Sequence, residues 1–182
     1  MKNIAVIIAF FFVCSLNLIA QEPISYSKVI QTDSVGKDVL FSTIHEWFAM
    51  NYNSANDVIQ LADKEGGTIL GKGLFSYSLG KLMYNCYDGT ISYTIKVTIK
   101  DNRYKVDLLN FTHKSCPACN VSCSMGLITT AEQYTASSFD NKAMTKIWVD
   151  AKVKIENYAN SIFYSLEEKT NSIKTEIIDS NW

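Results

Sequence analysis

The sequence contains no cluster of basic residues and very little histidine. Its 17 Lys and Arg residues are offset by 18 Asp and Glu residues, with no basic block, so charge gives no reason to predict a nucleic-acid partner. The two histidines, His45 and His113, belong to no recognisable Ser/His/Asp pattern. We therefore predict no catalytic residues and no cofactor.

Long apolar runs are also missing after residue 20, so no later segment is predicted to cross a bilayer. Residues 1–20 have the make-up of a secretory signal: Lys2 supplies a positive start, residues 4–13 are apolar, and Ala20 is small enough for cleavage. An uncleaved anchor and a lipid on Cys14 are the alternatives, and the short run and the bulky residues before Cys14 count against them. The sequence thus predicts export to the periplasm or cell envelope.

The chain that remains after such a cleavage, residues 21–182, has the length of one domain and a formal charge of −2 without Lys2. Its clearest feature is a β-hairpin over residues 89–111. Apolar and polar residues alternate along the first strand, which predicts one buried and one open face. The apolar set is Ile91, Tyr93, Ile95, Val97 and Ile99. Asp101 and Asn102 tolerate positive φ and suit the tight turn that follows.

Three strands and a helix are predicted before or beside this hairpin. A strand is expected at 26–31, and an amphipathic helix at 35–50 with Asp33 or Ser34 as its cap. Two further strands are expected at 57–64 and 68–78, joined by the Gly66-Gly67 pair.

A second and longer helix is predicted to start near Asp140 and to run for about six to eight turns. Residues 171–182 are expected to form a frayed tail. The order of elements is therefore β-α-β-β-β-β-α. This order predicts an α+β fold, with an antiparallel sheet of about five strands and two helices packed on one of its faces.

The other face of the sheet carries polar side chains and is predicted to meet water or a partner. Its candidate partner-facing residues are Thr94, Lys96, Thr98, Lys105 and Asp107. They follow from the same alternation that buries the apolar set. This open face is one of two candidate sites.

Several short runs occur in order between residues 26 and 111: Trp47-Phe48, SANDVIQ at 54–60, GGTI at 66–69, GKG at 71–73 and DNRY at 101–104. Together they resemble a family of secreted Bacteroidetes proteins of unknown function that have a TATA-binding-protein-like fold. The resemblance implies a curved sheet backed by two helices, export to the envelope, and no known reaction. The family name describes shape alone, because DNA binding would need a basic surface that this composition does not offer.

The cysteines form the second candidate site. Residues 112–138 are predicted to be an irregular loop, and this loop departs from the pattern of the family. It carries three of the four cysteines left after export, and the fourth precedes the central hairpin: Cys86, Cys116, Cys119 and Cys123. An oxidising compartment favours disulfides. We favour Cys116–Cys119 with Cys86–Cys123, because an antiparallel hairpin brings its two ends together.

Two other chemistries remain open for this loop. Cys116-Pro-Ala-Cys119 could be a redox pair, although no βαβ unit or following helix is predicted around it. His113, Cys116, Cys119 and Cys123 could instead hold a metal ion, with Cys86 able to replace the histidine. The function we predict is a non-enzymatic envelope protein that binds an unknown partner through the open face or the cysteine loop. The alternative is thiol-disulfide exchange or metal binding at Cys116 and Cys119.

Overall fold

A six-stranded antiparallel sheet forms the centre of the molecule. The computed structural model describes residues 21–52, 58–116, 123–134 and 141–179. Five strands are paired in the order β1-β5-β4-β3-β2. They are β1 (Tyr26–Gln31), β2 (Ile59–Asp63), β3 (Thr68–Tyr77), β4 (Gly89–Lys100) and β5 (Arg103–Ser115), and the short β6 (Gly126–Leu127) pairs with β5. The predicted α+β fold with an antiparallel sheet is confirmed.

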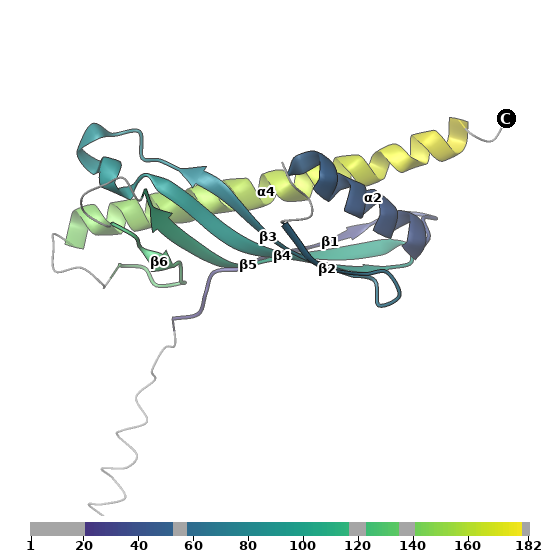
Figure 1. The fold of residues 1–182 in the computed structure, drawn as a ribbon, viewed down its shortest axis with the longest axis horizontal. Helices are drawn as coiled ribbons and strands as arrows, with labels where there is room; N and C mark the ends of the chain where they lie inside the picture. Colours follow the sequence, from purple (N-terminus) through teal and green to yellow (C-terminus); the bar gives the residue numbers. More distant parts are fainter. Residues whose placement is uncertain (1–20, 53–57, 117–122, 135–140, 180–182) are drawn as a thin grey trace, which may run out of the picture.

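Both long helices pack on the same face of this sheet. Helix α2 (Lys37–Asn51) contacts β4, and helix α4 (Asn141–Asp179) contacts β1, β5 and α2. In Figure 1, α4 runs along the length of the sheet while the long strands curve across it. The predicted apolar residues of β4 are 0–2% exposed and form the sheet side of the hydrophobic core. Trp47 on α2 and Trp148 on α4 are each 3% exposed, as expected for amphipathic helices whose apolar sides face the sheet.

The turns of the sheet follow the predicted chemistry. Asn102 has a φ of 64° in the β4–β5 turn, and Gly67 has a φ of 66° in the β2–β3 turn. The predicted cap of α2 was wrong, because the helix begins after Gly36 without a side-chain cap. Its first free amide, that of Lys37, instead donates to the Asp101 carboxylate at 2.8 Å. The β4–β5 turn therefore stabilises the start of α2.

The predicted irregular loop at 112–138 was wrong at its start, because β5 continues to Ser115. The cause is a β-bulge at Asn110, where φ is 57° and the register with β4 shifts between Ser92 and Thr94. Before the bulge the even-numbered residues of β5 are buried, and after it Phe111, His113 and Ser115 are buried. A strict period of two ends at such a bulge even though the strand continues.

The long helix was predicted too short. Residues 171–179 continue α4, which has 39 residues, so the expected frayed tail begins no earlier than residue 180. Leu166, Thr170 and Ile173 keep one buried stripe into the last turns. Thr170 is polar, but its hydroxyl is hydrogen-bonded to the Tyr104 hydroxyl at 3.0 Å, which lets a polar residue occupy a core position. Between β3 and β4 the chain forms a 3₁₀ helix, η1 (Leu82–Tyr87).

Candidate functional site

The sheet face opposite the helices, here called the open face, brings cationic residues from two strands together. In the β4–β5 pairing Lys96 lies opposite Asp107, and Lys100 lies opposite Arg103. These rows border a common concavity of about 360 Å³, which we call the basic hollow. Its lining residues are Val29, Lys96, Thr98, Lys100, Arg103, Tyr104, Lys105 and Asp107.

The basic hollow has one carboxylate, and that carboxylate is already engaged. Asp107 forms an ion pair with Lys105 at 2.8 Å and accepts a hydrogen bond from the Ser27 hydroxyl. Partial burial of Asp107 favours its neutral form, but the hydrogen bonds from Lys105 and Ser27 outweigh this and hold its pKa below the ordinary value. Lys100 and Arg103 form no ion pair within the described part of the chain. The hollow therefore keeps an excess of positive charge.

All five predicted partner-facing residues point to this side of the sheet. Four of them line the basic hollow, whereas Thr94 lies one register row away, between Lys72 and Leu109. The alternation places Lys100 on the polar face, but the candidate partner-facing set left out both Lys100 and Arg103, which flank the predicted turn. It also missed Val29, which joins the hollow only because β1 pairs with β5 opposite Lys105.

Exposed apolar side chains share the open face with these cations, and one of them, Val29, also lines the basic hollow. Val29 is 52% exposed, Leu61 is 50% exposed and Leu74 is 63% exposed. The pairing register places each of them on the open face, with Val29 opposite Lys105, Leu61 opposite Leu70 and Leu74 opposite Ser92. The open face thus combines cations with separate apolar contacts rather than being uniformly charged.

The cysteines lie at the opposite end of the central hairpin. The Cys116 amide donates to the Asp88 carbonyl at 2.8 Å, which holds it beside the segment that carries Cys86. Burial raises the pKa of the Tyr87 hydroxyl to about 12, with the neighbouring Cys123 and Cys86 thiols adding to the effect. Cys86, Cys116 and Cys123 are each partly buried. The disulfide pairing remains a prediction, and Cys119 lies outside the described residues.

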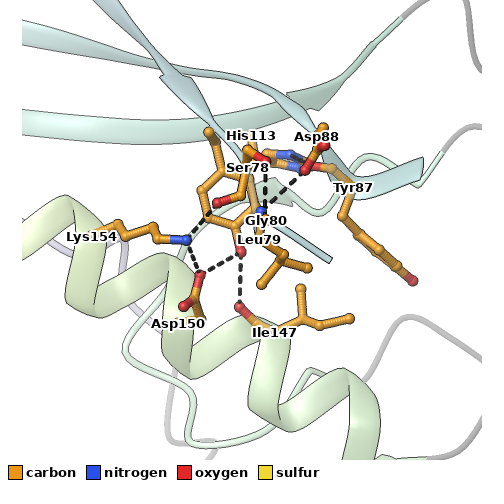
Figure 2. Close-up of polar contacts among 10 residues, drawn as sticks. Ser78, Leu79, Gly80, Tyr87, Asp88, His113, Ile147, Asp150 and Lys154 are labelled. Carbon is orange, nitrogen blue, oxygen red and sulfur yellow. Dashed lines mark hydrogen bonds and ion pairs between the residues drawn. The ribbon is translucent and has the colours of Figure 1, made fainter. Parts of the chain in front are cut away.

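His113 has a structural position at this end. It is 1% exposed, and the Met125 amide donates to its Nδ1 at 3.0 Å. Its Nε2 therefore carries the proton and donates to the Tyr87 carbonyl at 2.9 Å. Figure 2 shows His113 beside Asp88 and Tyr87, where β4 begins. Both ring nitrogens are engaged, so a metal ion could bind His113 only by displacing a backbone partner.

The described residues contain no group of three or more His, Cys, Asp or Glu side chains placed to hold a metal ion. The predicted metal set of His113, Cys116, Cys119 and Cys123 includes one residue outside the described ranges. Metal binding at this loop remains a hypothesis that the geometry around His113 does not favour, and thiol exchange remains a hypothesis.

Comparison with known proteins identifies the class of the fold. Residues 26–114 match the family model of a domain of unknown function, DUF4468, with a TBP-like fold. This segment of the chain therefore belongs to that family, and the resemblance predicted from the sequence is confirmed. A search of curated proteins gave no match.

Two crystal structures share the fold. A TBP-like protein from Parabacteroides distasonis is 16% identical, with a TM-score of 0.59 over 80% of this chain and 93% of that one. A DUF4468 family protein from Bacteroides ovatus is 20% identical, with a TM-score of 0.55 over 81% of this chain and 86% of that one. At these identities the likeness establishes the fold and no activity.

Proposed function

We propose that this protein is an exported, non-enzymatic binding module that holds an acidic segment of a protein partner on its open face. The observation that carries the proposal is the basic hollow, which gathers Lys96, Lys100, Arg103 and Lys105 in a chain whose net charge is −1. Only one carboxylate faces these four cations, and it is paired with Lys105. A partner that brings carboxylates would complete the charge balance, with Arg103 able to bind one of them through two parallel hydrogen bonds.

The apolar side chains on the same face favour a protein as the partner. Val29, Leu61 and Leu74 are half or more exposed on this face, and Val29 also lines the basic hollow. Protein interfaces combine apolar contacts with arginine and a polar rim, whereas binding to nucleic acid depends mainly on many phosphate contacts. An acidic segment with a few apolar residues therefore matches this face better than a uniformly charged polymer.

The chemistry of the hollow supports a binding role rather than catalysis. Neither His nor Cys is among its lining residues. Asp107 is its one carboxylate, and the hydrogen bonds from Lys105 and Ser27 keep it charged at neutral pH. A general base is most effective when its pKa lies near the working pH, so Asp107 is poorly suited to that task.

Export is supported by the composition of residues 1–20. In the described part of the chain, no helix has the length and apolarity needed to cross a membrane. The intact mass of the secreted protein should correspond to a chain that starts at Gln21. A species that keeps Met1, or one that carries lipid on Cys14, would contradict this part of the proposal.

The test of the binding role is fluorescence anisotropy with a labelled poly-glutamate peptide. The exported protein should bind it, and affinity should fall as salt is raised. The double variant K100E/R103E should bind about tenfold more weakly or worse, because each reversal replaces an attraction by a repulsion near 1 kcal/mol. Neither residue has an ion-pair partner to lose within the described ranges.

Lys64→Glu is the matched control. Lys64 is an exposed lysine in the β2–β3 turn, outside the basic hollow, and its reversal should leave peptide affinity unchanged. Equal binding by K100E/R103E and the wild type would overturn the proposal. So would a single-stranded oligonucleotide of equal charge that binds more tightly than the peptide, since it would point to a phosphate polymer as the partner.

A further inference from the structure

A second surface, distinct from the open face, lies where η1 meets the first turns of α4. We propose that this surface docks the protein on an anionic lipid bilayer, with Leu82 and Met83 entering the interface and nearby lysines meeting lipid phosphates. The proposal does not depend on the basic hollow or on its partner.

The apolar tip formed by Leu82 and Met83 is the most exposed pair of large apolar side chains in the described chain. Leu82 is 90% exposed and Met83 is 83% exposed. They are adjacent at the start of η1 and follow directly after Lys81. Single exposed apolar residues are common on soluble proteins, but two neighbours with almost no protein contact leave a continuous apolar surface in water.

The segment that carries the tip is held in place. The Leu79 amide donates to the Asp88 carboxylate at 3.1 Å, which closes the base of the loop. The Tyr87 hydroxyl donates to Met144 Sδ on α4 at 2.9 Å. On the other side Lys154 of α4 donates to the Ser78 carbonyl at 2.6 Å, as Figure 2 shows. The tip is therefore presented on a fixed support rather than on a loose chain end.

The space beside the tip is basic. A cavity of about 520 Å³ lies between the β3–η1 connection and α4, and Lys81, Lys142 and Lys146 line it. Its one acidic lining residue is Asp150, which is paired with Lys154 at 2.9 Å and accepts a hydrogen bond from the Tyr77 hydroxyl at 3.1 Å. Among the lining residues, lysines therefore outnumber carboxylates by three to one.

Projecting apolar side chains beside lysines match the two layers of a membrane surface. Apolar residues gain by entering the boundary between headgroups and acyl chains, and cations gain by staying among the anionic headgroups. An acidic protein would satisfy the lysines but would leave unexplained why two large apolar side chains beside them are 83–90% exposed. A bilayer can accommodate both the apolar pair and the lysines without a complementary protein surface, so the arrangement favours lipid.

The proposal is tested by co-sedimentation of the exported protein with lipid vesicles. Its intact mass is first checked, so that the protein used lacks residues 1–20. Vesicles of phosphatidylcholine with about 30% phosphatidylglycerol should bind it, and vesicles of pure phosphatidylcholine should bind it at least about tenfold more weakly. Each lysine near such a surface contributes about fivefold, equivalent to about 1 kcal/mol. Reversing both Lys81 and Lys146 to Glu should therefore weaken binding by at least about 25-fold.

The apolar tip is tested by L82S/M83S, which should also weaken binding while the thermal midpoint stays unchanged, because both side chains are exposed in the fold. Leu74→Ser, a matched change on the open face, should bind vesicles like the wild type, and so should K100E/R103E. The proposal is overturned if the wild type ignores anionic vesicles, if L82S/M83S binds as well as the wild type, or if Leu74→Ser loses as much. Loss of poly-glutamate binding in K81E/K146E would also overturn it, in favour of an acidic protein at the tip.

Discussion

Replacing the buried His113 by Phe should destabilise the protein although it keeps an aromatic ring in place. The ring packs edge-on against Tyr77, with centroids 5.1 Å apart, and Phe preserves this contact. What Phe removes is the pair of nitrogens that connect β5 to two other segments. His113 accepts from the Met125 amide and donates to the Tyr87 carbonyl, so both backbone groups lose their partner.

The magnitude follows from those two groups. A buried polar group that loses its partner costs about 1–3 kcal/mol. The hydrogen bond to Met125 is buried, whereas the one to Tyr87 is partly buried, so water can replace part of the second. We therefore expect His113→Phe to lower the free energy of unfolding by about 2–4 kcal/mol.

The same residue should make stability depend on pH. Burial lowers the pKa of His113, and the hydrogen bond to Tyr87 only partly opposes this. In the unfolded chain the imidazole titrates near its ordinary value of about 6.5. Below that pH the unfolded state binds a proton that the folded state does not, so stability falls until the lower folded pKa is reached. His113→Phe should lack this part of the acid sensitivity.

Urea titrations followed by tryptophan fluorescence, at pH values above and below about 6.5, measure both effects. His45→Phe is the matched control, because His45 is exposed on α2 and should change stability by less than about 0.5 kcal/mol. If His113→Phe is as stable as the wild type at neutral pH, the two backbone hydrogen bonds do not hold this end of the sheet, and the reasoning is refuted.

Two substitutions and one mapping experiment test the core and the cysteines. Trp47→Ala should cost about 3–5 kcal/mol by denaturant titration, since it empties a core position on α2; a cost near zero would contradict the packing described. Gly73→Ala should cost about 1–3 kcal/mol, because the new Cβ would lie 2.5 Å from the packed ring of Tyr93, and a neutral result would mean that this ring can move. Non-reducing peptide mapping of the exported protein should yield a peptide joining Cys86 to Cys123; free thiols at both would overturn the predicted pairing.

The fold was predictable because local pattern and tertiary environment agree over most of the sheet. Ile91, Ile95 and Ile99 alternate with polar residues, and one face of β4 is indeed covered by helices. The pattern failed where long-range contacts replace local signals. Asn110 introduces a bulge that reverses the buried face of β5, and the cap of α2 comes from Asp101, far along the chain.

The site was predictable only in part for a related reason. Alternation identifies which residues of β4 and β5 share the open face, so Lys96, Lys105 and Asp107 were found. Alternation does not show which strand lies beside β5, or which residues of the open face border one concavity. Both are properties of the folded sheet, and they bring Lys100, Arg103 and Val29 into the basic hollow. The low overall charge also concealed the local excess of cations, because the acidic residues are elsewhere on the molecule.

The central claim, that the open face binds an acidic partner, is tested most directly by mapping amide chemical shifts during a poly-glutamate titration. Shifts should concentrate on the rows of β4 and β5 that carry Lys96, Lys100, Arg103 and Lys105, with little change along α4. At the same peptide concentration the shifts should be much smaller in K100E/R103E. Shifts confined to α4 or η1, or an absence of saturable shifts in the wild type, would contradict the account.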